Sequence, residues 1–141
     1  MKKALDAWNT ELDAALSHRS DGQRTAIMRQ MTDLFLTTAD SLSEDHVALF
    51  DDVMMRLVDH IEHEALIQVS KRLAPIDNAP ANVIGKLSRS DDISISGPVL
   101  ERSSVLTDPD LIEIAQTKSQ NHLLAIAGRP KISTLVTTAL V

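Results

Sequence analysis

The N-terminal part of the chain repeats apolar residues with the spacing of α-helices. From about residue 3 to residue 17, Leu5, Trp8 and Leu12 recur every three or four positions, which predicts an amphipathic helix. Polar residues and a glycine then interrupt the pattern over residues 18–22, and Ser20 or Asp21 is suited to cap a second helix. We expect that helix over about residues 22–39. Its predicted inward positions are Ile27, Met31, Leu34, Phe35 and Thr38.

The longest periodic run follows, over about residues 44–73. The spacing of Ser41 and Glu44 matches a capping box at its start. The apolar stripe turns by about a quarter of the helix circumference near residues 60–64, at 100° per residue. This stretch contains no proline or glycine to cause a kink. The predicted helix either bends near residues 60–64 or continues with two halves that contact different neighbours, and we favour the second because no such residue is present.

Beyond Pro80 the predicted helices become short and are separated by turn residues. Apolar spacing and caps place them at about residues 83–87, 93–100 (interrupted by Gly97-Pro98), 108–117 (capped by Thr107), 122–127 and 133–140. Residues 99–107 and 126–133 also resemble each other, because in both an arginine closes a short helix and a hydroxyl residue caps the next. Stacked pairs of short helices are typical of an α-solenoid.

Composition narrows the classes of function. The chain lacks cysteine, which excludes disulfides and thiolate–metal sites and fits a reducing cytoplasm, the location we expect. The net charge is −6, and lysine and arginine are scattered, so nucleic acid is not an expected partner. There is no apolar core of a signal peptide and no run of about 18 apolar residues, so we expect neither export nor a membrane span.

Candidate chemistry is sparse. His60 and Glu64 are four residues apart and could share a metal ion on a helix, but the sequence places no third ligand, so we expect no metal and no cofactor. His63, followed by Glu64, is similar to the phosphoacceptor of dimeric histidine-kinase bundles, although the residues after it depart from that motif. No serine lies in the Gly-x-Ser-x-Gly pattern of a hydrolase nucleophile. Gly97-Pro98 lacks the consecutive backbone N–H donors of a phosphate-binding loop. The sequence predicts no catalytic constellation.

The C-terminal segment is the best candidate for a binding surface. It carries no charged residue after Lys131, and its apolar residues include Ile132, Leu135, Val136 and Leu140. A terminal solenoid repeat normally has a polar outer face, so an apolar last helix indicates a surface that a partner covers. The alternative is that both faces of this helix pack inside the domain.

One set of segments consists of residues 73–75, 79–83, 97–100, 110–115 and 122–129, together with residues 33–35 and 47–53. These segments resemble an uncharacterised alphaproteobacterial family that is known only as a domain of unknown function, and the similarity covers most of the chain. The resemblance implies a helical, HEAT-like fold and no known activity. Members are often longer and continue with a further helix, so we expect a fragment or a short version of the family.

Together these patterns predict an all-α fold in a single domain, residues 1–141. An N-terminal helical bundle part (1–73) would pack on a HEAT-like α-solenoid of short helix pairs (80–141). We expect a non-enzymatic protein–protein interaction or regulatory scaffold whose partner is another protein or a second copy of the chain. The alternatives are a phosphorelay component using His63 and an enzyme whose site assembles from distant residues.

Overall fold

The computed structural model describes residues 20–141, and these form eight α-helices and two 3-10 turns without any strand. The prediction of an all-α protein is confirmed for this range. The helix predicted over residues 3–17 lies outside the described residues. The chain divides into two compact units, residues 1–66 and residues 67–141, with the boundary inside helix α4 (His63–Leu73). Each unit is described separately below.

In the first unit, helix α2 (Asp21–Thr38) packs against helix α3 (Glu44–Leu57). Ser20 caps α2 as predicted, and it forms a capping box with Gln23. The rings of Phe35 and Phe50 meet edge to face with centroids 5.4 Å apart. The inward prediction for Leu34 is wrong, since 52% of this residue is exposed. The buried stripe of α2 consists of Thr25, Met28, Thr32 and Phe35.

The prediction of one continuous helix over residues 44–73 is also wrong. Helix α3 ends at Leu57, a 3-10 turn spans Val58–His60, and α4 starts at His63. Ile61 is extended and buried, and the backbone N–H of Glu62 donates to the hydroxyl of Thr25 on α2 at 3.2 Å. A partner 37 residues away thus satisfies a donor at the break. The position near residues 60–64, where the apolar stripe in the sequence shifts by a quarter turn, coincides with this break.

The start of α3 differs from the prediction by two residues. Its N-cap is Ser43, whose hydroxyl oxygen accepts from the backbone N–H of His46 at 3.2 Å. Ser41 instead lies in the preceding 3-10 turn (Ala39–Ser41), and its hydroxyl donates to the carbonyl of Thr38. The capping-box spacing of Ser41 and Glu44 was therefore misleading, because a nearer serine occupies the cap.

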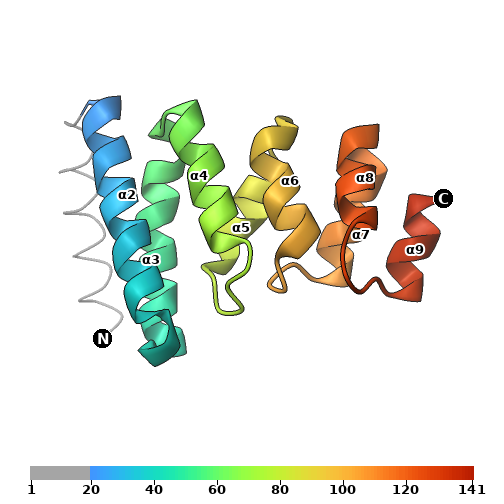
Figure 1. Cartoon of the computed structure of the whole chain (residues 1–141), viewed down its shortest axis with the longest axis horizontal. Coiled ribbons are helices and arrows are strands. Elements are labelled where there is room, and N and C mark those ends of the chain that lie inside the picture. The colour runs from blue at the N-terminus through green and yellow to red at the C-terminus, as the bar shows by residue number, and fades with distance from the viewer. Residues whose placement is uncertain (1–19) are drawn as a thin grey trace. The chain divides into compact units, whose positions relative to one another are not determined.

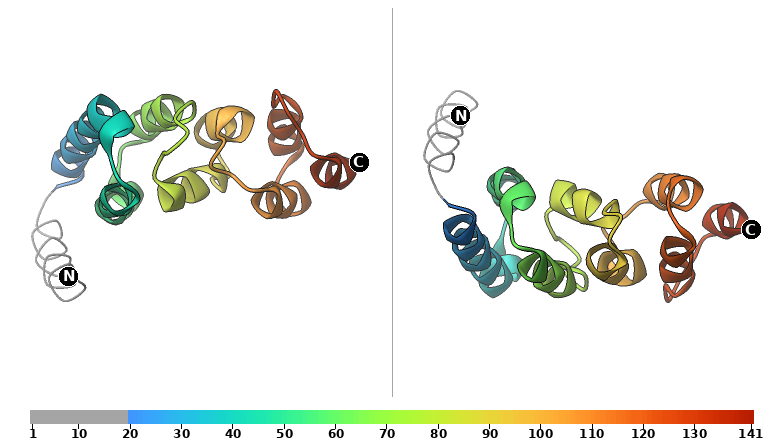
Figure 2. Two further views of the ribbon diagram at one scale, coloured as in Figure 1. Left: turned by 90° about the horizontal axis from the view of Figure 1, so that it is seen from below. Right: turned by 90° about the horizontal axis from the view of Figure 1, so that it is seen from above.

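The second unit contains the C-terminal part of α4 and five short helices. These are α5 (Ala81–Ser88), α6 (Ile93–Arg102), α7 (Asp108–Thr117), α8 (Gln120–Ala127) and α9 (Thr134–Leu140). Helix α8 packs beside α6, and α9 packs beside α7 (Figure 1). Seen along the helices, α6 and α8 form one layer, α5 and α7 form the other, and α9 closes the row (Figure 2). All five short helices lie within about two residues of their predicted positions.

Gly97-Pro98 does not interrupt α6, contrary to the prediction. The helix runs through both residues, with Pro98 as its sixth residue. Proline removes one backbone donor, but its fixed φ is compatible with the helix. Atoms of Ile93, on the same helix, lie nearest to where a Cβ at Gly97 would stand.

The assignment of the second unit to HEAT-like repeats stays a prediction, because the packing of alternate helices is shared by many helical proteins. No helix among residues 20–141 is long and apolar enough to cross a membrane.

Candidate interaction surface

Hydrogen bonds from serine and threonine side chains of its own segment stabilise the start and the later turns of helix α9. Ser133 is its N-cap, and its hydroxyl oxygen accepts from the N–H of Val136 at 3.2 Å. The hydroxyls of Thr137 and Thr138 donate to backbone carbonyls four residues earlier, at 3.0 and 2.8 Å. Both threonines are exposed, and their hydroxyl protons are already bonded within the helix, so their hydroxyl oxygens remain free only to accept.

The four residues predicted to bind a partner divide between the two sides of α9. Leu135 is 67% exposed, and Ile132 and Leu140 are partly exposed. Val136 is fully buried, so its place on the binding surface was wrongly predicted. Adjacent residues on a helix point about 100° apart, so when Val136 packs inward, Leu135 turns toward solvent.

Charge is distributed unevenly around this surface. Residues 119–141 contain none of the chain's 20 aspartate and glutamate residues, and their charged side chains are Arg129 and Lys131. Lys131 is exposed and stands two residues before the N-cap of α9. This segment is therefore weakly basic in a chain of net charge −6, whereas α7, which packs against α9, carries Asp108, Asp110 and Glu113.

Arg129 holds two helices together instead of capping its own. Its guanidinium donates to the carbonyl of Leu100 and to the carbonyl of Ser103, both at 2.6 Å, at the end of α6. Burial lowers the pKa of Arg129, and the charge of Asp108 opposes that shift. The sequence pointed to a role at a helix C-terminus, but the helix it closes is α6, not its own α8.

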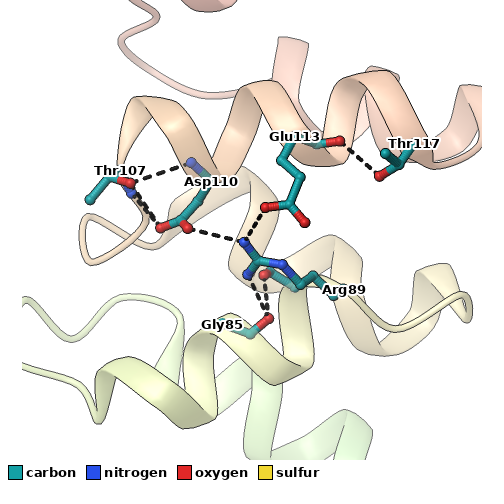
Figure 3. A network of polar contacts seen from close by, with 7 residues as sticks. Gly85, Arg89, Thr107, Asp110, Glu113 and Thr117 are labelled. Carbon is teal, nitrogen blue, oxygen red and sulfur yellow. Dashed lines mark hydrogen bonds and ion pairs between the residues drawn. The ribbon is translucent and has the colours of Figure 1, made fainter.

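A second polar network joins α5 to α7 (Figure 3). The guanidinium of Arg89 donates to the carboxylates of Asp110 and Glu113, at 3.0 and 3.2 Å, and to the carbonyl of Gly85. Hydrogen bonding to Glu113 is the main reason that the pKa of Arg89 is raised. Asp110 also completes a capping box with Thr107, the predicted cap of α7. Sequence analysis missed Arg89, because its partners lie 21 and 24 residues away.

His122, near the start of α8, is a buried histidine whose two ring nitrogens both have hydrogen-bond partners. Its Nε2 lies 2.8 Å from the carbonyl oxygen of Ser90 and 3.2 Å from the hydroxyl of Ser96, and its Nδ1 lies 2.8 Å from the hydroxyl of Ser119. Since a carbonyl can only accept, Nε2 carries the proton in this network. No pattern in the sequence predicted this cluster, which links three segments of the second unit.

Ser119 is the N-cap residue of α8, and its hydroxyl contacts the ring of His122 without bonding a backbone N–H. Ser43 and His46 repeat the contact between hydroxyl and ring at the start of α3, with the same three-residue spacing and a hydroxyl to Nδ1 distance of 3.1 Å. His122 is only 1% exposed, so a substrate has no access to its ring. The pair fixes the entry of a helix.

The phosphoacceptor candidate has a different setting from the one expected. His63 is exposed, but it is the first residue of the 11-residue helix α4 and not a residue in the middle of a long helix. His60 and Glu64, the proposed metal pair, belong to different elements. Among residues 20–141 no group of three or more potential ligands could hold a metal ion.

The described residues thus define an all-α protein built largely from short, stacked helices. The model of one family, described as "uncharacterised protein conserved in bacteria (DUF2336)", matches residues 95–141, which include most of α6 and all of α7 to α9. The expected likeness to an uncharacterised bacterial family is confirmed over this segment. No curated protein and no solved structure matches the chain. The narrower alphaproteobacterial assignment stays a prediction.

Proposed function

We propose that this protein is a non-enzymatic interaction module, or regulatory scaffold, that binds another protein chain through the outward side of α9. The centre of this surface is Leu135. Ile132 and Lys131 stand just before the helix, and the partly exposed Leu140 lies nearer to the side of buried Val136.

The observation that carries the proposal is the 67% exposure of Leu135 on a helix that has no charged residue. An exposed leucine is ordinary by itself, but here the other exposed side chains of the helix, Thr134, Thr137 and Thr138, carry no charge.

Binding at this surface would depend mainly on burial of apolar area. Complete burial of one leucine contributes about 1.5–3 kcal/mol. Each 1.4 kcal/mol corresponds to about a tenfold change in the dissociation constant. Loss of Leu135 from the interface should therefore weaken binding by roughly 10- to 100-fold.

The test is an affinity capture from lysate of the source cell with wild type and Leu135→Glu. Leu34→Glu is the matched control, because Leu34 is another exposed leucine, on α2, with 52% exposure. Circular dichroism first establishes that both variants are folded. Captured chains that disappear in Leu135→Glu and persist in Leu34→Glu support the proposal. Equal capture by all three proteins contradicts it.

The phosphorelay alternative is favoured by one observation, the exposure of His63 at the start of α4. A phosphoacceptor histidine must be reached by the aspartyl phosphate of its partner, which an exposed ring permits. Acid-labile phosphate on the purified protein, absent from His63→Gln and retained in His60→Gln, would support this alternative. Neighbouring His60 is a suitable control because it is also exposed.

A further inference from the structure

Helix α2 has a second apolar stripe besides the buried one, and residues 20–141 do not cover it. This second stripe consists of Ile27, Met31 and Leu34, and it lies about a third of the helix circumference from the buried stripe, at 100° per residue. Ile27 and Met31 are partly exposed, and Leu34 is 52% exposed. The apolar spacing of the sequence assigned these three residues to the interior, so a further segment is expected to cover them.

The chain that directly precedes α2 is the nearest candidate. The amphipathic helix that the sequence predicts over about residues 3–17 lies outside the described residues. Ser20 has extended backbone angles and caps α2, so α2 does not continue toward the N-terminus. Residues 18–20 therefore connect the predicted helix to α2, and helices joined by about 2–5 residues commonly form an antiparallel hairpin. Such a short connection also gives the segment a high effective concentration at α2, which favours it over a separate molecule.

The apolar residues of the two segments match in spacing when the segments run antiparallel. In the predicted helix the apolar residues are three and then four positions apart, whereas in the second stripe of α2 they are four and then three apart. Reversing one direction makes the two sets of intervals identical. The resulting pairs are Leu5 with Leu34, Trp8 with Met31, and Leu12 with Ile27.

Charge at the far end of α2 favours the same arrangement. The last turn of α2 contains no basic residue, and the exposed Asp40 follows it. The carbonyls at the end of a helix carry partial negative charge and are stabilised by nearby cations. An antiparallel segment brings Lys2 and Lys3, at the N-terminus of the chain, to this end of α2.

We propose that the second stripe of α2 is the docking site of the chain's own residues 3–17, which fold back on α2 as an antiparallel helix. Leu5, Trp8 and Leu12 then cover the second stripe, while the buried stripe of α2 continues to pack in the first unit (Figure 1). This surface is separate from α9, so the proposal does not depend on the proposed interaction function.

The first test uses Trp8, which is the only tryptophan of the chain, so its fluorescence reports on this segment alone. In the folded full-length chain, Trp8 should emit at shorter wavelength and be quenched severalfold less by acrylamide than in the urea-unfolded chain. The protection should be the same at every protein concentration. Met31→Glu should remove most of it, because a carboxylate would then face the indole ring. Ala26→Glu is the matched control, since Ala26 is exposed on α2 outside the second stripe, and it should retain the protection.

Disulfide cross-linking tests the register, since the natural chain has no cysteine. The pair Leu5→Cys and Leu34→Cys in one chain should oxidise readily to an intramolecular disulfide, which needs Cβ atoms about 3.5–4.5 Å apart. The control pair Leu5→Cys and Ile27→Cys should oxidise much more slowly, because Ile27 lies two helical turns from Leu34. Equal rates for the two pairs would overturn the antiparallel register.

Three other results would overturn the proposal. The first is equal quenching of Trp8 in the folded and unfolded wild type. The second is protection that appears only at high protein concentration, or a disulfide that forms only between chains, because the occupant would then be a second copy. The third is protection that a folded Met31→Glu variant leaves unchanged, because Trp8 would then pack elsewhere. If Met31→Glu fails to fold by circular dichroism, the wild-type quenching and the cross-linking rates still decide the question.

Discussion

Individual side chains in the second unit connect helices that are not consecutive in the sequence. Arg129 reaches back to the end of α6, and Arg89 reaches forward to α7. His122 joins the start of α8 to Ser90 and Ser96. Each of these side chains bonds to groups of another segment, so removing one breaks contacts between segments and costs more than the loss of a single surface contact.

We predict that Arg129→Ala lowers the free energy of unfolding by about 3 kcal/mol. This is the lower end of the sum for two lost hydrogen bonds of about 1.5–3 kcal/mol each, because Arg129 is only half-buried. Arg129→Lys should recover only part of this, since an ammonium lacks the planar fork. Urea denaturation measures both changes. Arg102→Ala, at an exposed residue of α6, is the control and should cost a few tenths of a kcal/mol. Equal effects at the two arginines would contradict the role of Arg129.

Asp110 should make stability sensitive to acid. Burial alone would raise the pKa of this carboxyl, but hydrogen bonds from Thr107 and Arg89 outweigh burial and lower it below the ordinary 3.8. A carboxyl with a lowered pKa in the folded state stabilises the protein above the ordinary pKa, and this stability is lost as the pH falls toward the folded-state pKa. Between about pH 4 and pH 2, wild type should therefore lose more stability than Asp110→Asn. Parallel pH profiles from urea denaturation would exclude this contribution.

At the scale of elements, caps and breaks decide where each helix begins and ends. Capping boxes start α2 and α7, and serine caps start α3 and α9. Between α3 and α4 the chain breaks without proline or glycine, and Thr25 of α2 accepts a hydrogen bond from the freed backbone at Glu62. Packing then determines which side of each helix is buried.

The two sides of α9 should respond differently to truncation. Val136→Ala should lower the free energy of unfolding by about 1–3 kcal/mol, because Val136 is fully buried and its methyl groups leave a cavity. Leu135→Ala should change it by less than about 0.5 kcal/mol in the monomer, because Leu135 is mostly exposed. Thermal unfolding at low protein concentration measures both. A larger effect at Leu135 than at Val136 would mean that α9 packs in another rotation.

At the scale of the molecule, the described residues form two compact units, and the second is a row of short helices. In such a row each helix is stabilised chiefly by its immediate neighbours. Helix α6 has packing partners in both α5 and α8, whereas α9 has α7 as its main neighbour. Stability is therefore expected to differ along the row.

Hydrogen exchange on the monomer should show this difference. Within the second unit, backbone amides of α9 should exchange faster than those of α6, because α9 packs mainly on one helix and α6 packs on two, so opening α9 exposes less buried surface. The comparison uses amides in the middle of each helix, away from frayed ends. Uniform protection across α5 to α9 would show that the second unit opens as one cooperative block.

The sequence by itself determined the helical class, the positions of the short helices and the caps at Ser20 and Thr107. These features arise from contacts within about four residues, such as apolar spacing and a hydroxyl that accepts from a nearby N–H. Apolar spacing also identified residues 132–140 as the candidate binding segment, and three of the four candidate residues there are at least partly exposed.

Only the tertiary structure decided the rest. In the structure Val136 is buried and Leu34 is exposed. The predicted long helix is interrupted at residues 58–62, and Arg129 bonds to the end of another helix. Such outcomes depend on partners that lie far along the chain: Thr25 is 37 residues from Glu62, and Leu100 is 29 residues from Arg129. Local periodicity contains no information about these partners, because the side of a helix that is buried and the donors that are satisfied follow from which elements pack together.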